Sequence, residues 1–226
     1  MKIVFEDKYF QIINKDPGIL STEVSPLICH RLDKDTSGLL VIAKNKKAKD
    51  VMQSLFKKRK IEKKYLALVL GRISKEKGRI EGYIVRHKKK GNKRRLIQAP
   101  IFGIKEKHKR LAISEYKIKN EYKIDLFKNQ SQLALNILTF VKIKILTGRT
   151  HQIRVQFSSL HHPVIGDLLY GGKLMKKISK HLKLKRQFLH AYKLKFIHPF
   201  TKEKIKIKIP LSQDLNKVLR KLKNRR

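Results

Sequence analysis

Residues 30–44 of the chain read HRLDKDTSGLLVIAK. The apolar run Leu39–Ala43 has a length that suits a buried strand. The polar residues just before it, around Ser37–Gly38, predict a tight turn. Asp33 therefore lies where a loop enters a strand, with a basic residue close on either side. Considered alone, this carboxylate is either a solvated charge in a surface turn or an ionised group that the surrounding cations hold in place.

The composition predicts a folded, strongly basic protein. The 226 residues are 41% apolar, enough for one large domain or two small ones. The 57 Lys and Arg residues outnumber the 17 Asp and Glu residues, which gives a formal net charge of +40. A bias toward lysine would not by itself deplete the acids, so we expect a polyanionic partner. Nucleic acid fits best, because Lys and Arg neutralise phosphates and release counterions. A membrane surface fits less well, because Trp is absent and no basic helix carries an aromatic face.

Cysteine and histidine usage gives no sign of a disulfide or a metal. The single cysteine, Cys29, excludes an intramolecular disulfide and gives no reason to expect an oxidising compartment. The histidines lack the partners and spacing of a metal site, so we expect no bound metal. Met1–Glu6 does not read as a signal peptide, and no apolar run approaches the ~18 residues of a membrane helix. We therefore expect a cytoplasmic protein, and we expect it to be a monomer.

The N-terminal third of the chain predicts short strands around one helix. Asn14–Gly18 contains a Pro-Gly pair and predicts a turn. Asn45 can cap a helix that runs to Lys58, because apolar residues recur there with helical spacing. Tyr65 stands at the entrance of the last strand of this region, where a tyrosine is usually a core aromatic with its hydroxyl at the boundary. The expected strands are Ile3–Phe5, Phe10–Ile13 and Lys63–Gly71.

A basic insertion follows at about residues 79–97. It contains the nearly all-basic segment His87–Arg95, with Gly91–Asn92 as the expected tip of a hairpin. Such a charge run is either a solvated loop or a flexible hairpin that grips RNA, and both interpretations stay open. Beyond the insertion we expect strands over Leu111–Lys119 and Glu121–Phe127 and over the alternating run Leu133–Leu146.

The C-terminal third predicts two helices and a strand pair. Thr150 can cap a helix through Leu160, on which His151 and Arg154, three residues apart, share a face. The glycines of Gly166–Gly172 predict a turn-rich connection. The remaining expected elements are strands over Phe188–Ile197 and Ile205–Ile209 and a helix that follows Ser212.

The residues alone leave the chemistry open. Glycosidase chemistry needs two facing carboxyl groups in different environments, and nothing gives Asp35 such a role beside Asp33. A nuclease would need several acids to hold magnesium, and the motifs of a zinc deaminase are absent. What remains is one aspartate, many cations and the tyrosine at residue 65.

Several segments resemble, in order, the motifs of the RluA-type pseudouridine synthases. Residues 30–44 resemble the HRLD-x-x-TSG-L signature, and residues 63–71 resemble the K-x-Y-x-A-x-V-x-G strand. Residues 147–154, TGRTHQIR, match a third motif. The remaining matches are the turn at residues 14–18, with Asp16 altered or inserted, the HPVIGD and YG pieces of residues 162–171, and the LHA and HP pairs at residues 189–191 and 198–199. Together the matches span nearly the whole chain.

This resemblance implies a fold and an activity. The fold would be α+β, with a bent, mostly antiparallel mixed sheet flanked by helices. We expect residues 1–226 to form a single catalytic domain into which the basic hairpin is inserted, with no N-terminal domain of the S4 kind. The activity would be isomerisation of uridine to pseudouridine in structured ribosomal RNA or tRNA, without a cofactor. The alternative from another class is a non-catalytic basic RNA-binding or ribosome-associated protein.

The resemblance also implies roles for individual residues. Asp33 would act at the ribose, either on C1′ or on the C2′ proton, Arg154 would pair with it, and Tyr65 would stack on the target base and could serve as a late base. A cation beside a carboxylate favours its ionised form. Arg31 would fill the gap left by a flipped nucleotide or contact a phosphate. The other expected substrate contacts are His30, Thr36, Arg149, His151 and Ile165, where Ile165 is either the apolar wall of the pocket or, more commonly for such a residue, part of the core. The charge run of the insertion, and not the resemblance, gives the expected RNA-backbone contacts Lys88, Lys89, Lys90, Lys93, Arg94 and Arg95.

Overall fold

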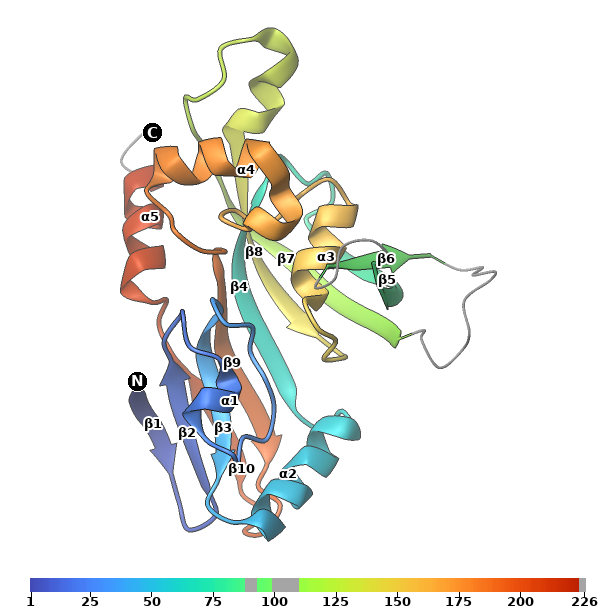
Figure 1. The fold of residues 1–226 in the computed structure, drawn as a ribbon, viewed down its shortest axis with the longest axis vertical. Helices are drawn as coiled ribbons and strands as arrows, with labels where there is room; N and C mark the ends of the chain where they lie inside the picture. Colours follow the sequence, from blue (N-terminus) through green and yellow to red (C-terminus); the bar gives the residue numbers. More distant parts are fainter. Residues whose placement is uncertain (88–92, 99–109, 224–226) are drawn as a thin grey trace. The chain divides into compact units, whose positions relative to one another are not determined.

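The computed structural model describes residues 1–87, 93–98 and 110–223. The chain divides into two compact units, drawn together in Figure 1. Unit 1 comprises Met1–Tyr65 and Leu189–Ser212, and unit 2 comprises Leu66–Phe188 and Gln213–Arg226. The organisation of residues 1–226 as one domain stays a prediction.

Unit 1 is a sheet covered by a short and a longer helix. Its strands follow the order β1, β2, β3, β9, β10, and all neighbours are antiparallel except the parallel pair β3–β9. Asn45 caps α2 by accepting a hydrogen bond from the Ala48 N–H at 2.9 Å, as expected. Met52 of α2 and Leu39, Val41 and Leu194 of the sheet share one buried core. The elements are β1 (Lys2–Glu6), β2 (Phe10–Lys15), α1 (Ser21–Val24), β3 (Ser37–Ala43), α2 (Lys46–Lys57), β9 (Leu189–Ile197) and β10 (Lys204–Lys208).

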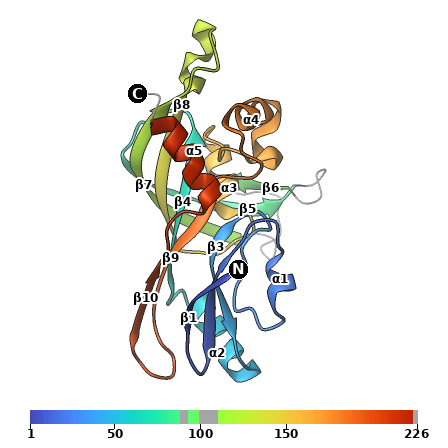
Figure 2. The ribbon, with the colours of Figure 1, turned by 90° about the vertical axis from the view of Figure 1, so that its left-hand side faces the viewer.

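Unit 2 is a sheet with helices packed against it, and its pairs β8–β7, β7–β5 and β5–β6 are antiparallel. The strand order is β4, β8, β7, β5, β6, and the first residues of β4 belong to unit 1. Figure 2 shows α5 beside β7, which it contacts. The elements are β4 (Glu62–Leu70), β5 (Lys77–Arg86), β6 (Arg94–Ile97), β7 (Arg110–Lys123), the 3₁₀ helix Gln130–Asn136, β8 (Ile137–Ile145), α3 (Gln152–Ser159), α4 (Leu168–Leu182) and α5 (Gln213–Lys223). The α+β class with a mixed, mostly antiparallel strand pairing is confirmed.

The expected tight turn at Ser37–Gly38 is wrong, because both residues belong to β3. The turn lies earlier, where the Thr36 N–H donates to the Asp33 carbonyl at 3.0 Å. Gly38 pairs with Ala191 of β9 at a φ of +120°, and a Cβ there would lie 2.3 Å from the Ala191 oxygen. Glycine is therefore required by close strand pairing rather than by a turn.

Two predicted strand boundaries are also wrong. Leu111–Phe127 is not two strands but the single strand β7, with a bulge between Ile118 and Asn120, which ends at Lys123. β8 begins only at Ile137, because the preceding residues form the 3₁₀ helix. Asn136, the last residue of this 3₁₀ helix, hydrogen-bonds the backbone of Phe127 in both directions through its side chain and so connects the helix to the segment after β7.

Two predicted helix boundaries need correction as well. Thr150 is not the N-cap residue of α3. His151 occupies that position with a φ of +56° but makes no side-chain capping hydrogen bond, and the Gln152 side chain accepts the Arg149 N–H instead. The expected irregular connection at 166–172 contains the start of α4, which Asp167 caps and which kinks at Gly172, where φ is +62°. A glycine pair inside a helix hid this element from the sequence pattern.

The flanks of the basic insertion form a hairpin. β5 and β6 pair antiparallel, with Val85 opposite Arg95. The expected tip at Gly91–Asn92 and the lysines Lys88, Lys89 and Lys90 lie outside the described residues.

Candidate active site

The loop that carries Asp33 is fixed on both sides. On one side, the Ser21 hydroxyl donates to the Leu32 carbonyl and accepts the Leu32 N–H, both at 3.0 Å. On the other side, the Lys34 carbonyl accepts the Gly18 N–H at 3.0 Å. Asp33 itself is half-buried. Unit 1 therefore holds the backbone of this carboxylate in one position, as a catalytic group requires.

Lys15 is a buried cation that binds this loop to the turn before it. Its side chain is fully buried, and its ammonium donates to the carbonyls of Asp16, Ile19 and Lys34 at 2.7, 2.9 and 3.0 Å. A buried charge is tolerated only when its donors are satisfied, and carbonyl oxygens serve that purpose here. The lysine of the Asn14–Gly18 turn thus supports the loop that contains Asp33.

Replacing Lys15 with Met is expected to lower both stability and activity. The stem can still pack, but three carbonyls lose a charged donor, so we expect a loss of about 3 kcal/mol in the free energy of unfolding. Denaturant unfolding measures this loss, and turnover is compared under conditions where the variant is folded. The control is Lys44→Met, which removes a surface ion pair with Glu6 and should cost less than about 1 kcal/mol. Equal stability of the two variants would contradict this role for Lys15.

Tyr65 lies within electrostatic reach of Asp33. The tyrosine is buried, at 7% exposure. Burial raises the pKa of its hydroxyl, and the charge of Asp33 raises it further. The phenol therefore stays neutral at physiological pH, where it can donate a hydrogen bond and present an aromatic face. This favours the stacking role for Tyr65 over the role of a free phenolate base.

His30 supports the same loop through its ring. Its Nε2 accepts the Val41 N–H of β3 at 3.1 Å, and its ring lies 4.5 Å from that of Phe56. Desolvation by burial, followed by the charge of Lys63, lowers the pKa of His30 from 6.5 to about 3. The imidazole is therefore neutral and joins the loop to the strand, and its contact with substrate stays a prediction.

The low pKa of His30 makes the stability of the fold depend on pH. The unfolded histidine takes up a proton near pH 6.5 while the folded one does not, so acid favours the unfolded chain. Between pH 7 and pH 5 the wild type should lose about 2 kcal/mol from this group. In His30→Gln, which keeps an acceptor but does not titrate, that part of the loss should be absent. Urea unfolding at both pH values measures the difference, and parallel pH dependences would contradict the assignment.

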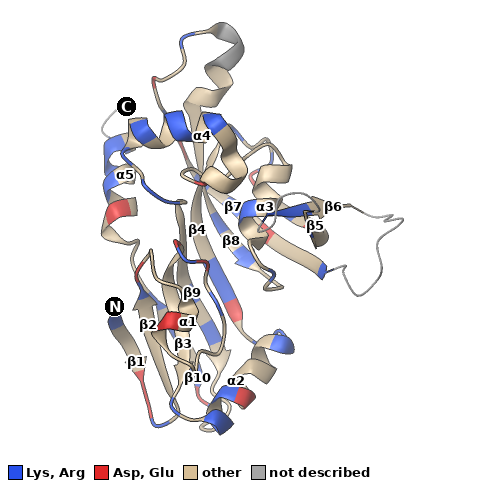
Figure 3. Ribbon diagram, viewed as in Figure 1, with Lys and Arg blue, Asp and Glu red and all other residues tan. Residues whose placement is uncertain are grey.

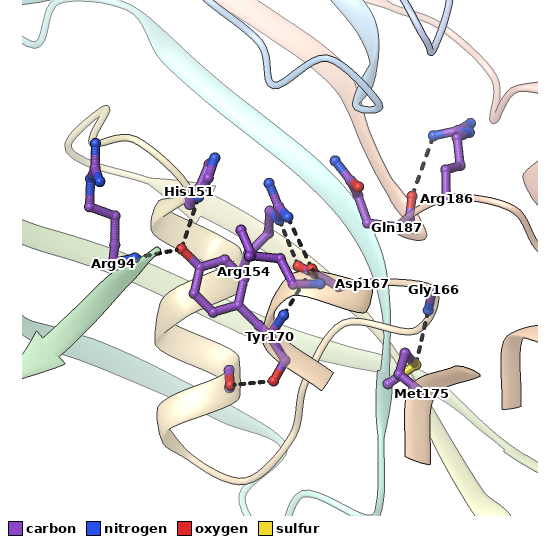
Figure 4. Close-up of polar contacts among 11 residues, drawn as sticks. Arg94, His151, Arg154, Gly166, Asp167, Tyr170, Met175, Arg186 and Gln187 are labelled. Carbon is purple, nitrogen blue, oxygen red and sulfur yellow. Dashed lines mark hydrogen bonds and ion pairs between the residues drawn. The ribbon is translucent and has the colours of Figure 1, made fainter. Parts of the chain in front are cut away.

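In unit 2, a buried aspartate holds Arg154. The Arg154 guanidinium donates to both oxygens of Asp167, from Nε at 2.6 Å and from the terminal nitrogen at 3.0 Å, and both side chains are buried (Figure 4). Asp167 also caps α4 by accepting the N–H groups of Leu169 and Tyr170. A bidentate pair fixes the plane of a guanidinium. Arg154 is therefore oriented by its own unit, and its pairing with Asp33 stays a prediction.

Tyr170 connects α3, α4 and the basic hairpin. Its hydroxyl lies 2.8 Å from Nδ1 of His151 and accepts the backbone N–H of Arg94 at 3.0 Å (Figure 4). The Arg154 guanidinium carbon lies 5.2 Å from the centre of its ring, and the Lys93 ammonium lies 5.6 Å from it. His151 and Arg154, which the sequence predicts to share a face, therefore both contact Tyr170. The base of the hairpin is held next to the same tyrosine by the Arg94 hydrogen bond.

The other predicted site residues vary in exposure. Arg31 and Arg95 are exposed, and Arg149 is half-buried, with its Nε donating to the Leu111 carbonyl at 2.9 Å. Thr36 and Ile165 are buried, at 2% and 0% exposure. Their predicted substrate contacts stay predictions, and the burial of Ile165 agrees with packing in the core.

Comparison with known proteins identifies the family. A profile described as RNA pseudouridylate synthase matches residues 9–159. The chain belongs to this family. Members of the RNA pseudouridylate synthase family isomerise uridine to pseudouridine in RNA. The predicted resemblance is therefore confirmed at the level of family and reaction.

Individual relatives of this family cover the chain almost completely. Ribosomal large subunit pseudouridine synthase D of Buchnera aphidicola is 34% identical, over 99% of this chain and 73% of its own length. An uncharacterized RNA pseudouridine synthase of Bacillus subtilis is 30% identical, over 97% of this chain and 76% of its own. The structure of human RNA pseudouridylate synthase domain containing 1 is 27% identical with a TM-score of 0.72, covering 98% of this chain and 94% of that one.

The structural roles of two buried charged residues, Asp167 and Lys15, are not visible in the sequence. Asp167 is part of the HPVIGD match, but Arg154 is expected from the sequence to pair with Asp33 alone; an aspartate just before a helix would have indicated a cap. Lys15 looked like one lysine of a turn, and only its burial separates it from the others.

Within residues 1–87, 93–98 and 110–223, no helix has the length and apolar character to span a membrane. The same residues contain no group of three or more His, Cys, Asp or Glu placed to hold a metal.

Proposed function

We propose that this synthase modifies uridine in structured ribosomal RNA or tRNA, with Asp33 as the group that acts at the ribose. The observation that carries the proposal is the placement of Asp33 on a doubly anchored loop, close enough to a buried, neutral Tyr65 to raise that residue's pKa. Both candidate roles, attack on C1′ and removal of the C2′ proton, need an ionised carboxylate in a fixed position.

The reaction is redox-neutral and balances within the uridine. The bond from C1′ to N1 breaks, uracil rotates, and a bond from C1′ to C5 forms, while C5 gives up a proton and N1 gains one. No electron donor or acceptor is required, which agrees with the expectation of no cofactor. Arg154, oriented by Asp167, supplies the cation that favours an ionised aspartate in this proposal.

Access to the glycosidic bond requires the base to leave its stack. This costs a few kcal/mol, and phosphate contacts from the basic surface can offset the cost. We assign Arg31 to the space left by the nucleotide because it is exposed next to the catalytic loop. We assign Lys93, Arg94 and Arg95, together with Lys88, Lys89 and Lys90, to the RNA backbone. Action as a monomer in the cytoplasm is part of the same proposal.

Ribosomal RNA is the substrate to test first, since one relative carries the large ribosomal subunit in its name. The purified protein is incubated with unmodified ribosomal RNA and with unmodified tRNA, and pseudouridine is measured by mass spectrometry of the nucleosides. We expect pseudouridine at one or a few positions in one RNA class. If neither RNA gains pseudouridine, the proposed substrate class is wrong. Mapping modified positions in a strain that lacks the protein then identifies the target uridine.

A further inference from the structure

The hairpin of β9 and β10 carries two parallel rows of lysines. Lys206 lies directly opposite Lys195, and Lys208 lies opposite Lys193, while Lys204 faces Ile197. Because side chains alternate along a strand, these residues share one face of the hairpin. We name this set the lysine ladder: Lys193, Lys195, Lys204, Lys206 and Lys208.

The ladder faces outward because the other face of the hairpin is core. Leu194 and Phe196 of β9 are buried, and Ile205 and Ile207 of β10 pack against the same cluster. The β10 lysines are exposed, and those of β9 are half-buried. Figure 3 shows Lys and Arg positions in blue along the strands of unit 1. The hydrophobic register of the hairpin therefore fixes the lysines on the solvent side.

This arrangement is electrostatically unfavourable for the protein alone. Like charges directly opposite each other destabilise a strand pair. Among the ladder lysines, and counting only carboxylates that the structure describes, Lys193 alone has a partner: Glu62 at 3.0 Å, which Lys64 also contacts at 3.4 Å. Burial acts to raise the pKa of Glu62, but the bonds and charges of these two lysines outweigh it and lower the pKa. Lys195, Lys204, Lys206 and Lys208 make no ion pair with a carboxylate in the described part of the chain.

A bound anion would relieve this repulsion. The even spacing of the lysines favours an anion whose charges repeat along its length. Lysines on one strand are ~7 Å apart, and opposite lysines are ~5 Å apart, so the ladder is a continuous cationic strip. A phosphate backbone presents charges at regular short intervals along such a strip. A lipid surface fits poorly, because Ile197 is the large apolar side chain exposed in this register and offers no broad apolar face.

We propose that the lysine ladder binds the phosphate backbone of the substrate RNA, outside the target nucleotide. This inference rests on the proposed function, because it takes the partner to be the RNA that the enzyme modifies. It adds a binding surface in β9 and β10 that is separate in sequence from the catalytic signature and from the basic hairpin.

The test neutralises four ladder lysines in the full-length protein. The variant Lys195→Gln, Lys204→Gln, Lys206→Gln, Lys208→Gln is compared with a matched control, Lys46→Gln, Lys47→Gln, Lys57→Gln, Lys58→Gln. This control removes four exposed charges in the same unit, three in α2 and one at its C-cap. Affinity for ribosomal RNA fragments or tRNA is measured at several salt concentrations. In the ladder variant we expect the salt slope to fall by about 3 and the Kd at low salt to rise at least about tenfold. The control should resemble the wild type.

Further readouts separate binding from folding and from catalysis. Removing like charges should raise the melting temperature of the ladder variant, and Lys→Arg at the same four positions should preserve the salt slope. With saturating RNA, kcat should be unchanged while KM rises. A salt slope and Kd equal to those of the wild type would overturn the inference.

The remaining outcomes also decide. Self-association of the ladder variant with unchanged RNA affinity would also overturn the inference. That result would mean that the role of these lysines is to prevent edge-to-edge pairing between copies of the chain, as charged residues on edge strands often do. If the wild type forms no pseudouridine, the proposed function fails, whereas the comparison of salt slopes still tests the ladder.

Discussion

Asp33→Asn is expected to abolish pseudouridine formation, by at least about a thousandfold, while RNA binding and folding stay unchanged. Asparagine keeps the size of the side chain and can keep its hydrogen bonds, but it has neither a negative charge nor a basic oxygen. Neither attack on C1′ nor removal of the C2′ proton is then possible. Pseudouridine formation in a single turnover, with enzyme in excess over RNA, measures the chemical step directly.

A second aspartate in the same loop, Asp35, offers a matched control for this variant. Asp35 is half-buried in the same loop, two residues away, and Asp35→Asn should retain activity near that of the wild type. A second signature lies in Tyr65, because the charge of Asp33 contributes to its raised pKa. The pKa of Tyr65 should therefore fall in Asp33→Asn. Persistent activity in Asp33→Asn with normal RNA binding would remove the catalytic assignment.

Asp167→Asn is expected to cause a large loss of both stability and activity. It leaves the buried Arg154 guanidinium without a compensating charge, which costs about 3–5 kcal/mol when one partner of a buried pair is removed. Asparagine can still cap α4, so the helix start is preserved. Because Arg154 is no longer held in one plane, we expect turnover of the folded variant to fall by about a hundredfold or more. Urea unfolding and single-turnover assays in the folded range measure the two effects.

An exposed arginine–carboxylate pair provides the control for this variant. Glu81 accepts hydrogen bonds from Nε and a terminal nitrogen of Arg79 at 2.9 and 2.7 Å, and the side chains of Arg79 and Glu81 are 53% and 47% exposed. Glu81→Gln should therefore cost little stability and leave turnover unchanged, because neither side chain of this pair is buried. In the double variant Asp167→Asn, Arg154→Met, stability should partly return while activity stays lost. Full activity in Asp167→Asn would show that the pair only supports the fold.

The elements predicted correctly are those in which local signals agree with packing. α2 has a capping asparagine and an apolar stripe, and the strand signal at residues 63–71 combines length with apolar character. Elements were misplaced where a side chain far along the chain decides the backbone. Asn136 bonds to Phe127 in the segment between β7 and β8, where the sequence predicts continued strand. Gly38 pairs with Ala191 and so lies in β3, where the sequence predicts a turn. Such contacts leave no periodic trace in the sequence.

For the site, the sequence identified residue types better than their surroundings. The motif at residues 30–44 singled out Asp33, and the β4 motif singled out Tyr65. The carboxylate that orients Arg154 comes from a different motif, thirteen residues further on, so spacing on one helix could not reveal it. Burial of Lys15 was equally hidden, because a buried lysine looks the same in the sequence as the many exposed ones.

The carbonyl triad around Lys15 couples the end of β2 to the order of the loop at residues 30–36. If either segment opened alone, the Lys15 ammonium or its carbonyl acceptors would remain buried without a hydrogen-bond partner. The amide hydrogens of Gly18, Leu32 and Thr36, each bonded within this region, should therefore exchange with solvent as one cooperative group. We therefore expect a chain in which β2 has not yet formed to lack an ordered Asp33 loop and, under the proposed function, to be inactive until that early strand is in place.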